Sequence, residues 1–184
     1  IHYKTAFFKT KNLIEFEELS FSSYDPTLMT GLNRAEIGSV ANALRRFAEL
    51  KFAKLIADGK SADIIVLDGN LQCTLTNENK YLTELQESCI KNNIVLTALS
   101  KTTSLFTDDG NLLSVVLDRI SALPLWLYYP IVEINNKNHK AEMFFVKFHS
   151  KSKHAFRFEI FNQQKTKAEE LISLLSANCV DPIF

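Results

Sequence analysis

The sequence lacks the features that mark membrane-spanning, secreted and disulfide-bonded proteins. No apolar run approaches the roughly 20 residues that a transmembrane helix requires, and no charged-then-apolar signal peptide opens the sequence. There are only three cysteines, widely spaced and without a CxxC pair, so neither a disulfide framework nor a zinc site is predicted. We expect a soluble, cytoplasmic protein without membrane contact, whose thiols are free and buried or half-buried.

Net charge and the common catalytic motifs are also missing. The 21 basic and 21 acidic residues cancel, so a polyanion must bind at a local patch rather than through overall attraction. No GxSxG, P-loop or GxGxxG motif occurs, and the four histidines show neither HxH nor HxxxH spacing. These absences argue against serine hydrolases, common nucleotide-binding enzymes and histidine-based metal sites.

What the sequence does contain is enough apolar material for one core. It has 184 residues, of which 46% are hydrophobic, and no repeat, low-complexity tract or linker. A chain of this length and composition predicts a single domain over residues 1–184.

The N-terminal third predicts a β-hairpin followed by a long helix. Aromatic and β-branched residues favour strands at 3–8 and 13–21. Asn33 with Glu36 three residues later is typical of a helix start, and the helix should run to about Ala57. Its predicted buried face is apolar: Ile37, Val40, Leu44, Phe47, Leu55 and Ile56.

The middle of the chain predicts a strand, a helix and a second strand. Residues 63–69 (DIIVLDG) form a short apolar run without alternation, which favours a central strand of a mainly parallel sheet, covered on both faces. Asp68 then lies at the carboxyl end of that strand. A helix over about 79–91 and a buried strand over 94–99 complete the unit.

The C-terminal part adds further elements to this unit. We expect a helix over 111–123 ended by Pro124, strands over 126–134, 142–148 and 155–161, and an amphipathic helix over 165–176. The predicted class is α/β: an RNase H-like mixed sheet, built of the antiparallel hairpin plus parallel strands and flanked by helices, with additional C-terminal strands and a helix.

Two carboxylates stand out within this predicted fold. Asp68 ends a strand where ligands of open α/β sheets collect, although it could equally cap the following loop through backbone amides. Glu49 lies in the long helix, where an ion pair with Arg45, four residues earlier, is the ordinary alternative. Together the two acids suggest a site for a hard divalent cation such as Mn²⁺ or Mg²⁺.

Four segments resemble the NurA nucleases: FAEL (47–50), IIVLDGNL (64–71), LSKTTSL (99–105) and HAFRFEIF (154–161). The 19-residue step from Glu49 to Asp68 is similar to the family's spacing between its helix Glu and its strand Asp. This resemblance implies a Mn²⁺-dependent nuclease of single-stranded DNA and DNA ends, acting 5′ to 3′ in end resection and double-strand break repair. It also implies a homodimer that works with a HerA-type hexameric ATPase.

The family pattern extends beyond the segments that match. NurA proteins begin with a strand ending in a VDGS-like motif, whose Asp is a metal ligand, and continue after a DPIF-like stretch into a GYPY-like segment and a later His. This sequence starts at Ile1 and stops after DPIF (181–184). We therefore expect a chain truncated at both ends, which lacks one metal-binding carboxylate and does not hydrolyse DNA efficiently by itself.

Several basic and hydroxyl side chains are further candidates for contact with nucleic acid. Lys101 and Thr102 follow a predicted strand and could bind a phosphate, although an exposed lysine is more often only solvated. Arg45 lies beside Glu49. Arg157 is two residues from Glu159 on a predicted strand, which favours a structural ion pair and leaves DNA contact as the alternative.

The leading hypothesis is thus a Mn²⁺-dependent deoxyribonuclease with Glu49 and Asp68 as catalytic metal ligands. Two alternatives remain open. The chain could be a noncatalytic RNase H-like subunit of a DNA-processing assembly, or an unrelated α/β module that binds a ligand at its strand ends.

Overall fold

The computed structural model describes residues 2–9, 12–20, 37–75, 77–132, 134 and 136–179, with side chains from residue 41 onward. The chain divides into two compact units: unit 1 comprises residues 1–63 and 73–94, and unit 2 comprises residues 64–72 and 95–184. The prediction of a single domain stays a prediction.

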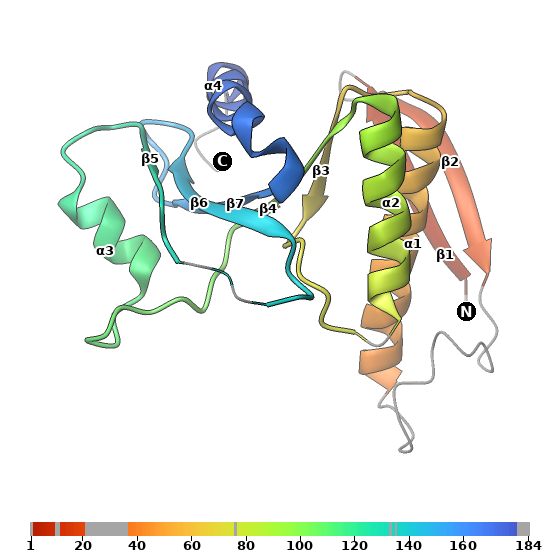
Figure 1. The fold of residues 1–184 in the computed structure, drawn as a ribbon, viewed down its shortest axis with the longest axis horizontal. Coiled ribbons are helices and arrows are strands. Elements are labelled where there is room, and N and C mark those ends of the chain that lie inside the picture. The colour runs from red at the N-terminus through yellow and green to blue at the C-terminus, as the bar shows by residue number, and fades with distance from the viewer. Residues whose placement is uncertain are drawn as a thin grey trace. The chain divides into compact units, whose positions relative to one another are not determined.

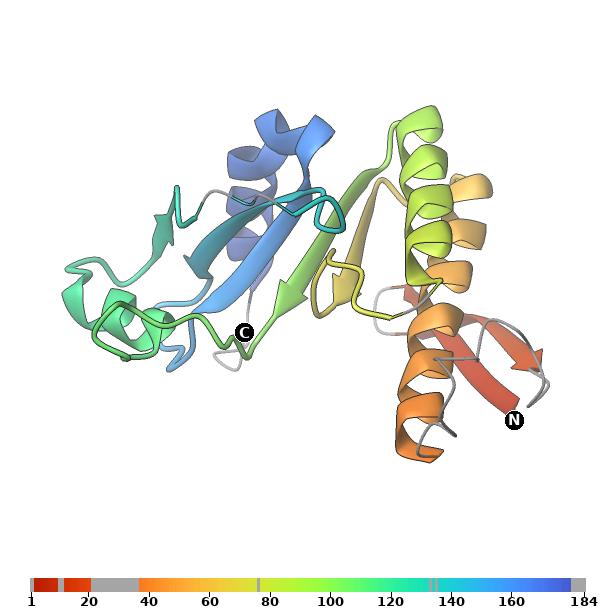
Figure 2. The same ribbon diagram turned by 60° about the horizontal axis from the view of Figure 1, so that its bottom comes forward.

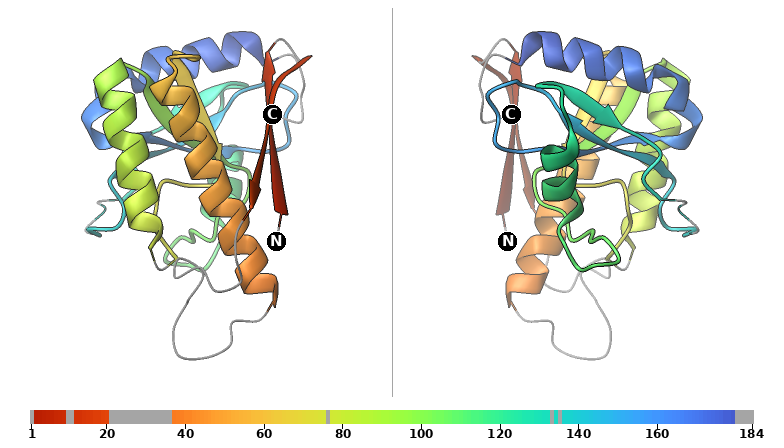
Figure 3. Two further views of the ribbon diagram at one scale, coloured as in Figure 1. Left: turned by 90° about the vertical axis from the view of Figure 1, so that its right-hand side faces the viewer. Right: turned by 90° about the vertical axis from the view of Figure 1, so that its left-hand side faces the viewer.

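Unit 1 contains a hairpin and two helices (Figure 1). Strand β1 (His2–Lys9) pairs antiparallel with β2 (Asn12–Ser20), which confirms the predicted hairpin. Helices α1 (Ile37–Asp58) and α2 (Glu78–Asn92) lie side by side (Figure 3). Their position matches the predicted helices, although the expected start at Asn33–Glu36 lies outside the described residues.

The side chains of α1 are buried on more than one side. Near the middle of the helix Leu44, Phe47 and Ala48 form an apolar cluster, against which Tyr81 of α2 packs. The next turns bury a different side of the helix, and Leu55, which was expected on the buried face, is 50% exposed. Leu44, Phe47 and Ile56 of the predicted face are buried, so the prediction is wrong for Leu55 alone among the predicted residues with described side chains.

Unit 2 is built on a five-stranded sheet with the order β3-β4-β7-β6-β5 (Figure 2). The strands are β3 (Ile64–Asp68), β4 (Val95–Ser100), β5 (Trp126–Tyr128), β6 (Ala141–Lys147) and β7 (Phe156–Phe161). Strands β3 and β4 are parallel, and the other pairs are antiparallel. The helices of this unit are α3 (Leu113–Ile120), a 3₁₀ helix (Asn162–Lys167) and α4 (Ala168–Asn178).

The core of unit 2 lies between one face of the sheet and α4. Alternate residues of β6 and β7 point to this face because side chains alternate along a strand. Phe144 and Phe158 are both buried, with ring centroids 6.2 Å apart, and they pack with Leu171 and Ile172 of α4. The predicted apolar side of the C-terminal helix therefore packs in this core.

The sheet differs from the predicted arrangement in three respects. In the described residues the hairpin β1–β2 forms a separate two-stranded sheet, so it does not belong to the mixed sheet. Strand β3 is an edge strand rather than a central one, and Val66 is 43% exposed. Strand β5 has three residues instead of nine, and Pro130, which lacks the N–H that a ladder requires, follows soon after it.

The α/β class and the parallel pair β3–β4 are confirmed. None of the helices in the described part of the chain combines the length and apolarity needed to cross a membrane.

Candidate active site at the carboxyl ends of β3 and β4

Asp68 is exposed at the carboxyl end of the parallel pair. It is the last residue of β3 and pairs with Leu99 of β4. The chain turns immediately afterwards, because Gly69 adopts a φ of +106°, which side-chain-bearing residues rarely adopt. The Gly69 N–H donates to the carbonyl of Leu99 at 3.0 Å and so fixes the turn against β4. Asp68 thus lies where the fold class places ligands, as predicted from its strand.

The loop that follows Asp68 is held by a buried carboxylate that the sequence did not single out. Glu159 of β7 is fully buried and accepts the backbone N–H of Leu71 at 2.7 Å. His139 Nε2 lies 2.9 Å from the same Glu159 oxygen, and Arg157 Nε donates to the other oxygen at 2.6 Å. Glu159 therefore joins β7, the loop after β3 and the segment before β6.

Asp68 and Glu159 point to opposite faces of the sheet. Directly paired residues carry their side chains on the same face, and successive residues alternate. Glu159 is paired with Ala98, which is paired with Leu67, the residue before Asp68. Glu159 consequently positions the loop and is not placed to share a ligand with Asp68.

The surroundings of Glu159 keep it ionised. Burial raises the pKa of this carboxyl group, but the hydrogen bond from His139 and the charge of Arg157 lower the pKa by more, so it lies below its ordinary value. The predicted ion pair between Arg157 and Glu159 is confirmed. A direct role of Arg157 in nucleic-acid binding stays a prediction.

A pocket of about 440 Å³ lies at the same end of the sheet, where β4 ends and antiparallel β7 begins. Three segments of unit 2 line it: Lys101, Thr102 and Thr103 after β4; Leu112, Ser114, Val115, Asp118 and Arg119 at α3; and Lys153, His154 and Ala155 before β7. The predicted residues Lys101 and Thr102 both line this pocket, two and three residues beyond the partner of Asp68.

The pocket is positively charged. Asp118 is the one acidic side chain in its lining, and the Asp118 carboxylate accepts a hydrogen bond from Lys147 at 2.7 Å. Lys101, Arg119 and Lys153 are exposed, and within the described residues none of them pairs with an acid. Sequence reasoning missed Arg119 and Lys153, because a helix residue and a turn residue carry no local pattern that assigns them to the end of β4.

Glu49, the second predicted ligand, belongs to an ion-pair network within unit 1. Arg46 donates to Glu49 at 2.9 Å and to Glu78 at 2.8 Å. Glu78, which is buried, also accepts the N–H groups of Thr74 and Leu75 at 2.8 and 3.0 Å, ahead of α2. The helix ion pair that we gave as the alternative role of Glu49 exists, but its partner is Arg46 rather than the exposed Arg45.

The charge of Arg46 is strongly favoured in this network. Burial lowers the pKa of the guanidinium, but the hydrogen bonds and charges of Glu78 and Glu49 raise it by more, so the pKa lies above its ordinary value. Within the described part of the chain no group of three or more His, Cys, Asp or Glu side chains is arranged to hold a metal ion. A metal ion shared by Glu49 and Asp68 stays a prediction.

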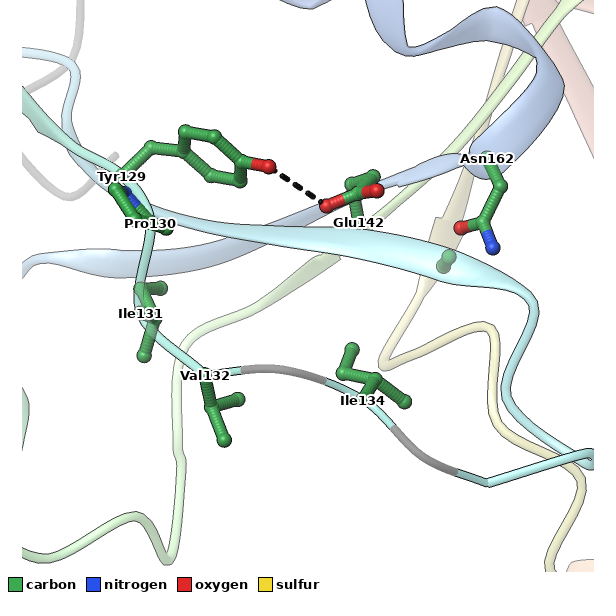
Figure 4. Close-up of a pocket in the computed structure, with 8 residues that line it drawn as sticks. Tyr129, Pro130, Ile131, Val132, Ile134, Glu142 and Asn162 are labelled. Atoms are coloured by element: carbon green, nitrogen blue, oxygen red, sulfur yellow. Dashed lines mark hydrogen bonds between the residues drawn. The ribbon is translucent and has the colours of Figure 1, made fainter.

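A second pocket, of about 460 Å³, lies beside β6 (Figure 4). The hydroxyl of Tyr129 donates to Glu142 at 2.9 Å, and Lys165 contacts both of these groups. Ile131 and Val132 lie on the segment below and point away from Glu142. Because its polar groups bind one another and the apolar side chains do not converge on them, this pocket is the weaker candidate.

Comparison of the chain with protein-family models, with curated proteins and with solved structures finds no match. The resemblance to NurA nucleases therefore depends on the four sequence segments and on the spacing of Glu49 and Asp68.

Proposed function

We propose that the chain is the α/β core of a metal-dependent deoxyribonuclease of the NurA type, with an RNase H-like fold. One observation supports this proposal above the others. The exposed carboxylate of Asp68 ends a parallel strand whose neighbour runs directly into a cationic pocket. Hydrolysis of a phosphodiester needs a carboxylate that can hold a divalent ion and cations that can hold the phosphate.

In this proposal Glu49 and Asp68 are ligands of Mn²⁺, or alternatively of Mg²⁺. Ions of this kind are often held by only one or two carboxylates, with water and substrate phosphates as the other ligands. The resemblance to the NurA pattern implies that a further Asp, from an N-terminal VDGS-like motif, completes the ligand set. The bound metal would supply an activated water and stabilise charge on the leaving oxygen.

The remaining residues act on the substrate or on the frame of the site. Lys101 and Thr102 would donate to a phosphate oxygen beside Asp68. Arg45, exposed on α1, would give an additional contact to the DNA backbone. Arg157 contributes through Glu159, which holds the loop after Asp68 in place.

The biological setting in the proposal comes from the resemblance alone. It comprises single-stranded DNA and DNA ends as substrates, 5′ to 3′ resection in double-strand break repair, a cytoplasmic homodimer and a HerA-type hexameric ATPase as partner. The sequence segments that carry the resemblance include both proposed ligands.

One observation favours a second candidate, a noncatalytic subunit of a DNA-processing assembly. The carboxylate of Glu49 already has a cationic partner in Arg46, which is fixed by the buried Glu78. An acid neutralised in this way binds a metal ion less readily.

Cleavage of labelled single-stranded DNA with Mn²⁺ by the full-length protein tests the proposal. Asp68→Asn and Glu49→Gln should each reduce cleavage to background while the circular dichroism spectrum is unchanged. Asp63→Asn is the matched control, because Asp63 is an exposed acid just before β3. Undiminished cleavage by Asp68→Asn would exclude the proposed site, and a wild-type protein without activity would favour the noncatalytic subunit.

A further inference from the structure

The pocket at the end of β4 contains more groups that could bind a phosphate than the predicted Lys101. Arg119 on α3 and Lys153 before β7 line the same pocket, so three segments distant in sequence each contribute a cation. The hydroxyl groups of Thr102 and Ser114 are additional donors in the lining. Because the carboxylate of Asp118 is engaged by Lys147, the excess charge is positive and is available to an anion.

The part of the pocket lining at the start of α3 is apolar and exposed. Leu112 and Val115 line it, and both have more than a third of their surface in solvent, at 38% and 44%. Phe106 forms an antiparallel bridge with Leu112 and is 57% exposed. Residues paired in this way carry their side chains on one face, so the ring of Phe106 extends the apolar wall.

We propose that this pocket binds one nucleotide unit of a single DNA strand, with its phosphate against Arg119 and Lys153 and its base against Phe106. A volume of about 440 Å³ is in the range of sites that hold one small molecule. Aromatic side chains bind bases of every type, since each base has a flat π-face. A duplex hides those faces in its base stack, so the apolar wall favours an unpaired strand.

The location of the pocket relates it to the proposed chemistry. Lys101 stands two residues after Leu99, the partner of Asp68. In this arrangement the strand would pass from the pocket toward Asp68, and the pocket would select which phosphodiester is presented. The choice of DNA as the ligand rests on the proposed nuclease function.

Binding of a fluorescent oligothymidine to the full chain, measured by anisotropy in EDTA, tests the cationic wall without cleavage. The variant Arg119→Ala/Lys153→Ala should bind about tenfold more weakly at low salt. The slope of log K against log salt should fall in magnitude by about 0.7, because the two cations hold one phosphate and each phosphate contact of a single strand contributes about 0.7. The matched control is Lys137→Ala/Lys140→Ala, which removes two exposed lysines outside the pocket lining and should change neither quantity.

The apolar wall is tested with a second strand that carries abasic sites. Phe106→Ala should weaken binding of the oligothymidine about tenfold, since stacking on an aromatic ring contributes about 1–3 kcal/mol per base. The same substitution should leave binding of the abasic strand unchanged. An equal loss for both strands would show that Phe106 only supports the fold, and it would overturn the stacking assignment.

The outcomes separate this inference from the proposed function. Wild-type affinity in Arg119→Ala/Lys153→Ala, or an equal loss in the lysine control, would overturn the pocket even if Asp68 proves essential for cleavage. If the pocket variants weaken DNA binding as expected but the wild-type protein never cleaves DNA with Mn²⁺, the binding pocket is supported and the nuclease function is rejected. Duplex DNA bound as tightly as the single strand, with the same dependence on Phe106, would overturn the assignment of an unpaired strand.

Discussion

The carboxylate of Glu159 accepts the backbone N–H of Leu71 at 2.7 Å, three residues after Asp68. This hydrogen bond joins strand β7 to the loop that follows Asp68, the proposed metal ligand. His139 and Arg157 complete the shell of Glu159, so a buried charge is fully paired. Such a network positions the loop only while all of its members are present.

Replacing Glu159 should therefore destabilise the fold strongly. Glu159→Leu leaves Arg157 and His139 without their acceptor and the Leu71 N–H without its partner. Breaking a buried ion pair from one side costs about 3–5 kcal/mol, and urea denaturation should show a loss of free energy of unfolding in this range. Glu87→Leu, at an exposed position of α2, is the control and should change it by less than about 0.5 kcal/mol. Equal effects would refute the structural role of Glu159.

Stability should also decline in acid through Glu159. Its pKa in the folded protein lies below its ordinary value of 4.5, so the folded state favours the ionised form. The resulting stabilisation is complete above the unfolded pKa and disappears as the pH falls through the lower folded pKa. Urea midpoints measured from about pH 6 to about pH 3 should fall more steeply for the wild type than for Glu159→Gln. Parallel curves would contradict this assignment.

The three cysteines should differ in reactivity. Burial, with a contribution from the charge of Asp58, raises the pKa of the Cys89 thiol to about 12. At pH 8 only about one molecule in ten thousand would carry the reactive thiolate. Iodoacetamide followed by peptide mass spectrometry should label the partly exposed Cys73 and Cys179 and leave Cys89 unmodified until urea unfolds the protein. Labelling of Cys89 at the rate of Cys73 in the native protein would be inconsistent with its burial.

Arg46 and Arg45 provide a matched pair of adjacent arginines on α1. Arg46→Met removes the cation between Glu49 and the buried Glu78 and should lower the free energy of unfolding by about 3–5 kcal/mol. Arg45→Met removes an exposed charge and should cost less than about 0.5 kcal/mol. Thermal unfolding followed by circular dichroism compares the two. Similar melting temperatures would show that the Arg46 network adds little stability.

The sequence patterns predicted the individual helices and strands better than the order in which the strands pair. The apolar runs that contain Ile65 and Leu96 indicated two parallel strands, and these are present. The same run suggested that β3 was a central strand covered on both faces, whereas β3 is at the edge of the sheet and Val66 is exposed. An apolar run reports that a residue prefers burial, but strand order depends on pairing between distant segments.

Contacts between distant segments were also missed at the candidate site. Asp68 was identified because its strand and the following Gly69 are adjacent in sequence. Glu159 was interpreted only as the partner of Arg157, two residues away. Its role in holding the loop depends on hydrogen bonds with Leu71, which is 88 residues distant, and with His139, which is 20 residues distant. No local pattern encodes such contacts.

Binding of Mn²⁺ to four proteins tests the central claim most directly: the full-length wild type, Asp68→Asn, Glu49→Gln and the double variant, each titrated by electron paramagnetic resonance. If the two carboxylates hold one ion, each single variant should lose most of the affinity, and the double variant should lose little more than either alone. Unchanged affinity in Asp68→Asn, or losses from the two variants that simply add, would contradict a shared metal site.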